Sequence, residues 1–116
     1  MGKKVKKPYN GGQWSKARYW GFIRSNLRMA SRKWGPRIEA LKMARRAYKG
    51  PNKRQKWEHQ CKKCSKWFKA TLVQVDHITP CGALTEFRHL PGFVKRMFCE
   101  VDGFQVLCKE CHKGKP

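Results

Sequence analysis

The chain has 116 residues, a length that supports one domain with one modest hydrophobic core. Its formal net charge is +21, from 28 Lys and Arg against 7 Asp and Glu, so a polyanionic partner is expected and nucleic acid is the first candidate. An anionic membrane surface is the second candidate, but no apolar run approaches the roughly 20 residues that span a bilayer, and we expect no membrane association. The Lys-rich start, Met-Gly-Lys-Lys-Val, has no apolar segment after it, so we expect an intracellular rather than a secreted protein.

Charge divides the chain near residue 57. Residues 1–57 carry 18 basic and 1 acidic side chains, a net charge of +17, whereas residues 58–116 carry 10 and 6, a net charge of +4. This shift predicts a basic N-terminal arm over residues 1–57 and a compact core over residues 58–116.

The arm is expected to be a helical hairpin behind a disordered tail. Residues 1–12 are Lys-rich and end in Asn-Gly-Gly, which predicts disorder. Apolar residues recur every three or four positions over 13–34, and again from Pro36 to about Lys49, which predicts two helices. Residues 50–56 are expected to be a basic linker. The expected nucleic-acid contacts are Arg18, Arg24, Arg28, Arg32, Arg45, Arg46, Lys53 and Arg54.

The core is expected to combine short strands with an inserted helix. Residues 57–61 and 66–70 are expected to form a hairpin, and residues 71–77 and 104–107 two further strands. Residues 85–98 are expected to be mostly helical, broken near Pro91-Gly92, and to cover the metal sites. Residues 109–116 can make only a turn or two of helix, because Gly114 and Pro116 resist it.

Two Cys-x-x-Cys pairs, Cys61/Cys64 and Cys108/Cys111, are separated by 43 residues. Each pair lets two thiolates reach one ion from a tight turn, so together they predict a tetrahedral site for structural Zn²⁺. Disulfide pairing is the alternative, and it suits a secreted protein better. Cys81 and Cys99 are left over and are expected to be core thiols.

Asp76 and His77 end the first of the two further strands, and His112 directly follows the last cysteine. A carboxylate is a natural ligand for Mg²⁺, and a neutral imidazole, with an ordinary pKa near 6.5, can accept a proton from water. Neighbouring side chains point to opposite faces of a strand, but at a strand end both can approach one site. His59 is expected to line the first cysteine turn or to touch phosphate, and His89 to lie in the insertion.

The pattern Cys-x-x-Cys … Val-Asp-His-Ile-x-Pro … Leu-Cys-x-x-Cys-His-x-x-Lys, over residues 61–115, resembles the HNH endonucleases, and most closely the small free-standing HNH nucleases of tailed phages. The resemblance implies an α+β fold, with a small zinc-stabilised ββα-metal core behind the basic helical arm. It implies that Asp76 and His112 hold a divalent cation such as Mg²⁺. It also implies that His77 is the general base that activates water for attack on a DNA phosphate. One such site per chain implies nicking by a monomer, whereas double-strand cleavage needs two chains, as a dimer on DNA, or two events. The missing secretory signal predicts a cytoplasmic location (the host cytoplasm if phage-encoded).

The middle Asn of the family pattern is replaced by Gly103, which follows Asp102. We expect this turn to orient the His77 ring, through the Asp102 carboxylate or through the backbone at Gly103. The alternative function is a non-catalytic, zinc-stabilised nucleic-acid-binding protein. Gly103 favours this alternative, whereas a second ligand set at Asp76, His77 and His112 favours the nuclease. Homing, packaging support and host-DNA attack all stay open as biological roles.

Overall fold

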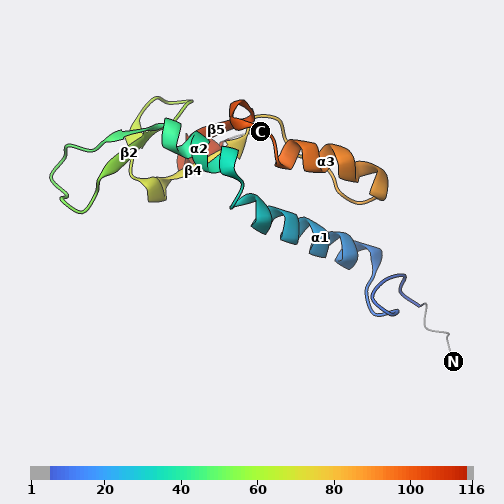
Figure 1. The fold of residues 1–116 in the computed structure, drawn as a ribbon. Coiled ribbons are helices and arrows are strands. Elements are labelled where there is room, and N and C mark those ends of the chain that lie inside the picture. Colours follow the sequence, from blue (N-terminus) through green and yellow to red (C-terminus); the bar gives the residue numbers. More distant parts are fainter. Residues whose placement is uncertain (1–5, 115–116) are drawn as a thin grey trace.

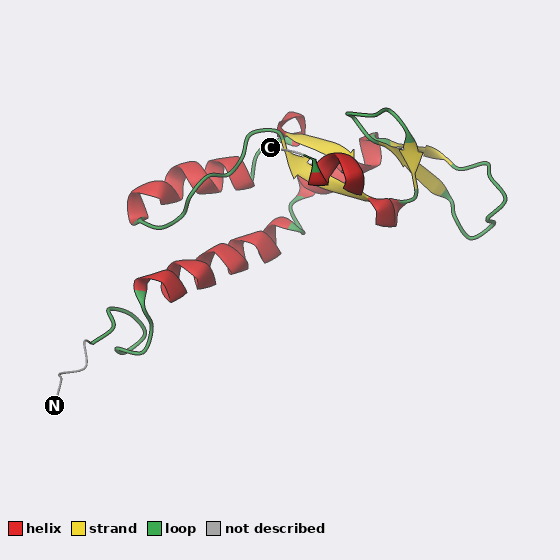
Figure 2. Ribbon diagram, turned by 180° about the vertical axis from the view of Figure 1, so that it is seen from behind, coloured by secondary structure: helices red, strands yellow, loops and turns green. Residues whose placement is uncertain are grey.

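The computed structural model describes residues 6–114, which form an elongated molecule with a small sheet at one end and two helices at the other (Figure 1). The three-stranded sheet has the order β1–β2–β3, and a two-stranded sheet, β4–β5, lies in the middle. Both views show α1 and α3 side by side at the far end (Figure 2). Mixed helix and sheet is what the α+β prediction requires.

The helices are α1 (Lys16–Ser31), α2 (Gly35–Met43), α3 (Leu90–Met97) and α4 (Lys109–Lys113). The strands are β1 (Arg45–Ala47), β2 (Trp57–Gln60), β3 (Trp67–Phe68), β4 (Val73–His77) and β5 (Phe104–Cys108). Three short 3-10 helices, η1 (Ala70–Leu72), η2 (Phe87–His89) and η3 (Val101–Gly103), connect them. No helix among the described residues is long and apolar enough to cross a membrane.

Helix α1 forms where the apolar periodicity predicts it. The Ser15 hydroxyl caps its first turn by accepting a hydrogen bond from the Arg18 amide, at 3.2 Å. Trp20, only 1% exposed, packs with Leu84, Phe93 and Met97 in a buried cluster. The inserted helix α3 therefore packs on α1. The sequence had predicted that this segment would cover the metal sites, and only its end does so, where the Met97 carbonyl contacts His77.

The expected disordered tail is partly ordered. Tyr9 and Trp14 form an isolated β-bridge, and the Tyr9 ring stacks on Tyr19 with 3.8 Å between centroids. Asn10 and Gly11, with φ angles of 55° and 63°, make the tight reversal between them. The prediction of disorder is therefore wrong for residues 9–12, and residues 1–5 lie outside the described part of the chain.

The second predicted helix ends at Met43 rather than near Lys49. Residues 45–47 instead form β1, which pairs antiparallel with β2 in the register Arg45↔His59 to Ala47↔Trp57. The ladder satisfies backbone groups that a helix would otherwise satisfy, and β1 is the edge strand of its sheet. The expected linker over 50–56 is thus the loop of a hairpin, and the pairing crosses the boundary expected at residue 57.

Strands β4 and β5 pair along their whole length, from Val73↔Cys108 to His77↔Phe104. Both strands confirm the sequence prediction, and α4 follows β5 without a loop. This arrangement puts the end of β4 beside the start of β5 and carries His112 back over the sheet on α4. The order β4, β5, α4 is what positions the candidate site.

Candidate metal centre and active-site cleft

The four cysteines of the two pairs meet beside the β4–β5 sheet. The Sγ atoms of Cys61, Cys64, Cys108 and Cys111 all lie within 4.8 Å of one another, and those of Cys64 and Cys108 are 4.0 Å apart. Four thiolates at about 2.3 Å from one tetrahedral ion lie roughly 3.8 Å apart. The cluster could therefore hold a zinc ion after small side-chain movements.

Backbone hydrogen bonds shape both cysteine turns. The Cys61 amide donates to the Lys66 carbonyl at 2.9 Å, and Ser65, with a φ angle of 62°, completes the reversal. The Cys64 amide lies 3.5 Å from the Cys61 Sγ, and the Cys111 amide 3.4 Å from the Cys108 Sγ. Such N–H···S contacts favour thiolates, which are the metal-ligating form.

The thiol pKa values in the cluster diverge. Burial raises the pKa of Cys61, but the amides of Cys64, Cys108 and Lys63 outweigh burial and bring the pKa to about 6. Hydrogen bonding to the Cys108 thiol, followed by burial, raises the pKa of Cys111 to about 12. Four adjacent thiolates repel one another, so one ionises readily and another resists. A bound cation would allow all four to ionise together.

Asp76, His77 and His112 line one cleft of about 540 Å³. The His112 Nε2 lies 3.7 Å from the Asp76 Oδ1, and the side chains of Asp76 and His112 are 14% and 40% exposed. Two ligand atoms about 2.1 Å from one octahedral cation lie roughly 3.0 to 4.2 Å apart. The distance between the two atoms is therefore compatible with two ligands of one cation.

Gln105 supports this pair from the neighbouring strand. Its Nε2 donates to the Asp76 Oδ2 at 3.2 Å, because Gln105 stands directly opposite Asp76 in the β4–β5 register. The bond orients the carboxylate and leaves Oδ1 toward His112. Sequence reasoning missed Gln105, since only the strand register reveals it.

The His77 ring contacts a main-chain carbonyl. Its Nε2 lies 2.9 Å from the oxygen of Met97, the last residue of α3, where helix carbonyls lack an in-helix partner. A neutral ring that donates here carries its proton on Nε2 and its lone pair on Nδ1. We expected the 102–103 turn to orient this ring, and the Gly103 carbonyl accepts the amide of Ile78, the next residue in the chain, at 2.9 Å.

Three arginines also line this cleft. Arg28 and Arg32 project from the end of α1 and Arg37 from the first turn of α2. Burial, with the nearby Arg32 second, lowers the pKa of Arg37. The cleft therefore gathers positive charge that attracts an anion. The sequence had predicted Arg28 and Arg32 as contacts but not Arg37.

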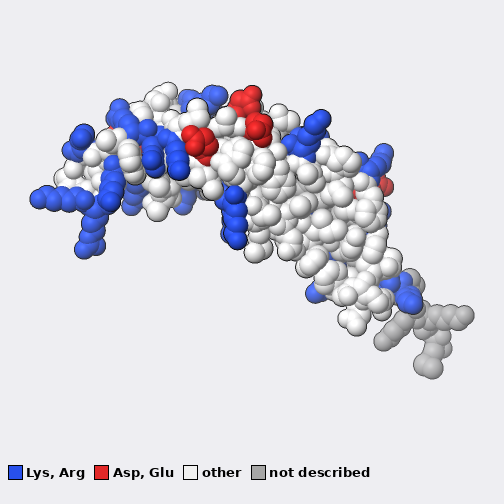
Figure 3. Space-filling view, in the orientation of Figure 1, with Lys and Arg blue, Asp and Glu red and all other residues white. Residues whose placement is uncertain are grey.

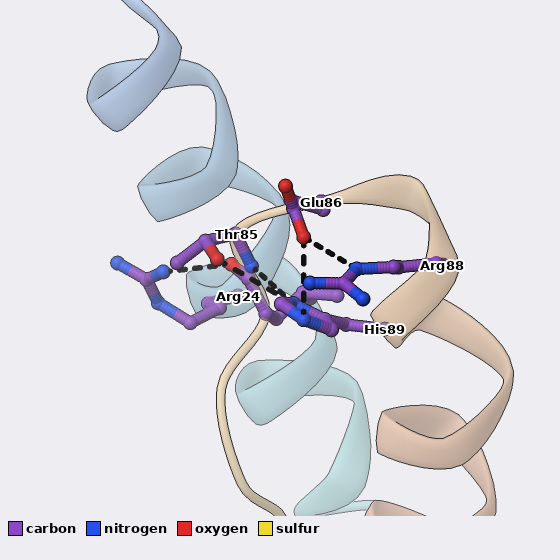
Figure 4. Close-up of polar contacts among 6 residues, drawn as sticks. Arg24, Thr85, Glu86, Arg88 and His89 are labelled. Carbon is purple, nitrogen blue, oxygen red and sulfur yellow. Dashed lines mark hydrogen bonds and ion pairs between the residues drawn. The ribbon is translucent and has the colours of Figure 1, made fainter.

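Arg24 and His89 lie outside the cleft, in a polar cluster that ties the 84–89 segment to α1 (Figure 4). Arg24 donates to the Leu84 carbonyl at 2.9 Å. His89 accepts the Thr85 amide at 3.2 Å through Nδ1 and lies 3.6 Å from Glu86 through Nε2. Both have structural contacts here.

The remaining predicted contacts belong to other surfaces. Arg18 is exposed, with its guanidinium 5.0 Å from the Trp14 ring centroid. Arg45 and Arg46 lie on β1, and Lys53 and Arg54 are exposed in the hairpin loop.

The structure also shows how far His59, Cys81 and Cys99 are buried. His59 lies on β2 and is only 5% exposed, so its side chain is buried and is not open to a phosphate of a nucleic acid. Burial, followed by the charge of Arg45, lowers its pKa. Cys81 and Cys99 are half-buried, and burial raises the pKa of both thiols. Cys81 also lines the cleft.

No protein-family model, curated protein or solved structure matches this chain. Fold and site together define a protein of mixed helix and sheet with a four-cysteine cluster that could hold zinc.

Proposed function

We propose that this protein is a metal-dependent DNA endonuclease of the HNH type, with zinc in a structural role. The observation that carries the proposal is the shared cleft: a carboxylate and two imidazoles, from Asp76, His77 and His112, line it together with three arginines. The succession of β4, β5 and α4 supports a ββα-metal core, and the four-cysteine cluster supports a zinc-stabilised one.

Each side chain has a role under this proposal. Asp76 and His112 would hold the divalent cation, which when bound supplies positive charge that stabilises the charge developing on the phosphate and the leaving oxygen. His77 accepts a proton from the attacking water at Nδ1, while the Met97 carbonyl fixes the ring through Nε2. Arg28, Arg32 and Arg37 bind phosphate oxygens of the substrate.

The second candidate function is a non-catalytic, zinc-stabilised nucleic-acid-binding protein. The same contact between His77 and the Met97 carbonyl favours it, because a histidine can simply cap the end of α3. Under this alternative the cleft binds phosphate and no bond is broken. Cleavage itself separates the two candidates.

The experiment compares the full chain with its His77→Ala variant on supercoiled plasmid, with Mg²⁺ or Mn²⁺ added. We expect the wild-type protein to nick the plasmid and His77→Ala to lose about 10²- to 10⁴-fold in rate, because the general base is gone. DNA affinity and zinc content should stay unchanged. His89→Ala is the matched control, since this histidine lies outside the cleft and should cut at the wild-type rate.

Equal cutting by His77→Ala would contradict the general-base role. A wild-type protein that binds the plasmid but never cuts it, with either cation, would favour the binding-protein candidate instead.

A further inference from the structure

The β1–β2 hairpin carries a fixed guanidinium on each of its two faces. Arg45 and Arg46 are neighbours in a strand, so their side chains point to opposite faces. Arg45 stacks on the Trp57 ring at 4.0 Å from its centroid. Arg46 stacks on Trp67 at 3.7 Å and also pairs with Glu58 at 2.7 Å. Stacking on indole rings limits the motion of both cations.

The tip of the hairpin is an ordered turn that presents two more cations. The Tyr48 amide donates to the Lys56 carbonyl at 2.9 Å, which extends the ladder beyond β1. At the tip, the Gln55 amide donates to the Asn52 carbonyl at 3.1 Å, and the Arg54 amide to the Asn52 side chain at 3.1 Å. This is a β-turn with an Asn-capped start, and its two central residues, Lys53 and Arg54, are exposed.

Positive charge is concentrated in this part of the molecule. Residues 44–69 hold ten basic side chains and one acidic side chain, Glu58. Figure 3 shows Lys and Arg gathered at this end, over the region of β2. The basic residues are Arg45, Arg46, Lys49, Lys53, Arg54, Lys56, Lys62, Lys63, Lys66 and Lys69.

We infer that the β1–β2 hairpin docks in the major groove of duplex DNA. That groove is about 12 Å wide and admits a two-stranded ribbon, whose strands lie about 4.8 Å apart. Phosphates line both of its walls, which matches cations on both faces of the ribbon. The deep, narrow major groove of double-stranded RNA would not admit the ribbon.

The inference rests on the proposed function for the identity of the polyanion, but it uses different residues. Asp76 and His77 belong to β4, which lies in the middle of the molecule, whereas the hairpin extends from one end (Figures 1 and 2). The hairpin would therefore bind the duplex to one side of the phosphodiester bond that is cut.

The test measures affinity for two duplexes of one sequence, using the His77→Ala protein so that the DNA stays intact. One duplex carries cytosine; the other carries glucosylated 5-hydroxymethylcytosine, whose sugars fill the major groove. We expect the protein to bind the glucosylated duplex at least about tenfold more weakly, because the ribbon is excluded.

Adding Lys53→Gln and Arg54→Gln should weaken binding to the plain duplex and abolish the preference between duplexes. The slope of log affinity against log salt should fall by about 1.8, for two lost phosphate contacts. Adding Lys16→Gln and Lys95→Gln instead is the matched control. These exposed lysines lie on α1 and α3, and their loss should leave the preference intact.

Equal affinity for the two duplexes, or a tip variant that behaves like the control, would overturn the inference. The nuclease proposal fails separately. If the wild-type protein discriminates between the duplexes but never cuts DNA, the hairpin inference stands and the nuclease proposal is wrong. If it cuts DNA but does not discriminate, the nuclease proposal stands and the hairpin inference is wrong.

Discussion

At the scale of single residues, Gly103 is in close contact with the side chain of Cys99. A Cβ atom built on Gly103 would lie 2.5 Å from the Cys99 Sγ and 3.1 Å from the Cys99 Cβ. There is no room for an Asn side chain unless Cys99 moves. The backbone of Cys99 is held, because its carbonyl accepts the Trp34 Nε1 at 2.6 Å, so the movement must come from its side chain. A side chain at 103 therefore requires the Cys99 side chain to shift.

This packing predicts the effect of adding a methyl group. Gly103→Ala should lower the free energy of unfolding by about 1–3 kcal/mol, because the new Cβ overlaps Cys99. Combining it with Cys99→Ala should recover part of that loss, because the overlapping sulfur is removed. Asp102→Ala is the control: the residue is exposed and its loss should be nearly silent. Chemical denaturation of the four proteins measures the differences.

The rescue is the decisive comparison. If Gly103→Ala is as stable as the wild type, or if Cys99→Ala makes it worse, the close contact does not explain the glycine.

The residues of the site show what a sequence can reveal and what it cannot. The resemblance to the HNH pattern singles out Asp76, His77 and His112, and the structure brings all three to one cleft. Their supporting partners do not follow. Gln105 is identified by strand register, and the Met97 carbonyl reaches His77 from 20 positions away in the chain. Neither has a side-chain signature that a pattern could detect.

At the scale of elements, the sequence located strands β4 and β5 and helix α1 because each has a clear period of apolar residues. It failed at β1 because the pairing partner, β2, lies ten residues further on, and pairing overrides a weak helical preference. It foresaw only part of what α3 covers. An apolar stripe shows that a helix is buried against something, and α3 packs on α1, while only its last residue, Met97, reaches His77.

The contact between α1 and α3 predicts a contrast within one helix. Trp20 is 1% exposed and Phe22, two positions away, is 54% exposed. Trp20→Ala should cost about 3–5 kcal/mol of stability, because it empties the centre of the buried cluster. Phe22→Ala should cost much less, since most of its surface is already in water. Thermal unfolding of both variants measures the contrast, and equal losses would mean that α1 does not pack through Trp20.

At the scale of the whole molecule, two separate buried clusters hold the chain. One joins α1 to α3 around Trp20 and Phe93. The other contains Cys61, Leu107 and Cys108, so its stability depends on the cysteine site. The Lys62 amide also donates to the Val106 carbonyl at 2.8 Å, which ties the first cysteine turn to β5. The four cysteines thus join the hairpin sheet to the strands and helix that carry Asp76 and His112.

We therefore expect one tightly held zinc per chain, and a local effect when it is lost. Cys64→Ser, or removal of the ion with a chelator, should remove the folding free energy that metal binding contributes. This contribution is on the order of 10 kcal/mol for structural zinc sites. Amide hydrogen exchange should accelerate over β2, β5 and α4, which surround the cysteines, and much less over α1, which belongs to the other cluster. Cys81→Ser is the matched control, because Cys81 lies outside the cysteine cluster and its loss should leave zinc content and exchange unchanged.

Elemental analysis that finds no zinc in natively purified protein, or the four thiols paired as disulfides, would contradict the assignment. Uniform acceleration across α1 as well would show that the two clusters unfold as one unit.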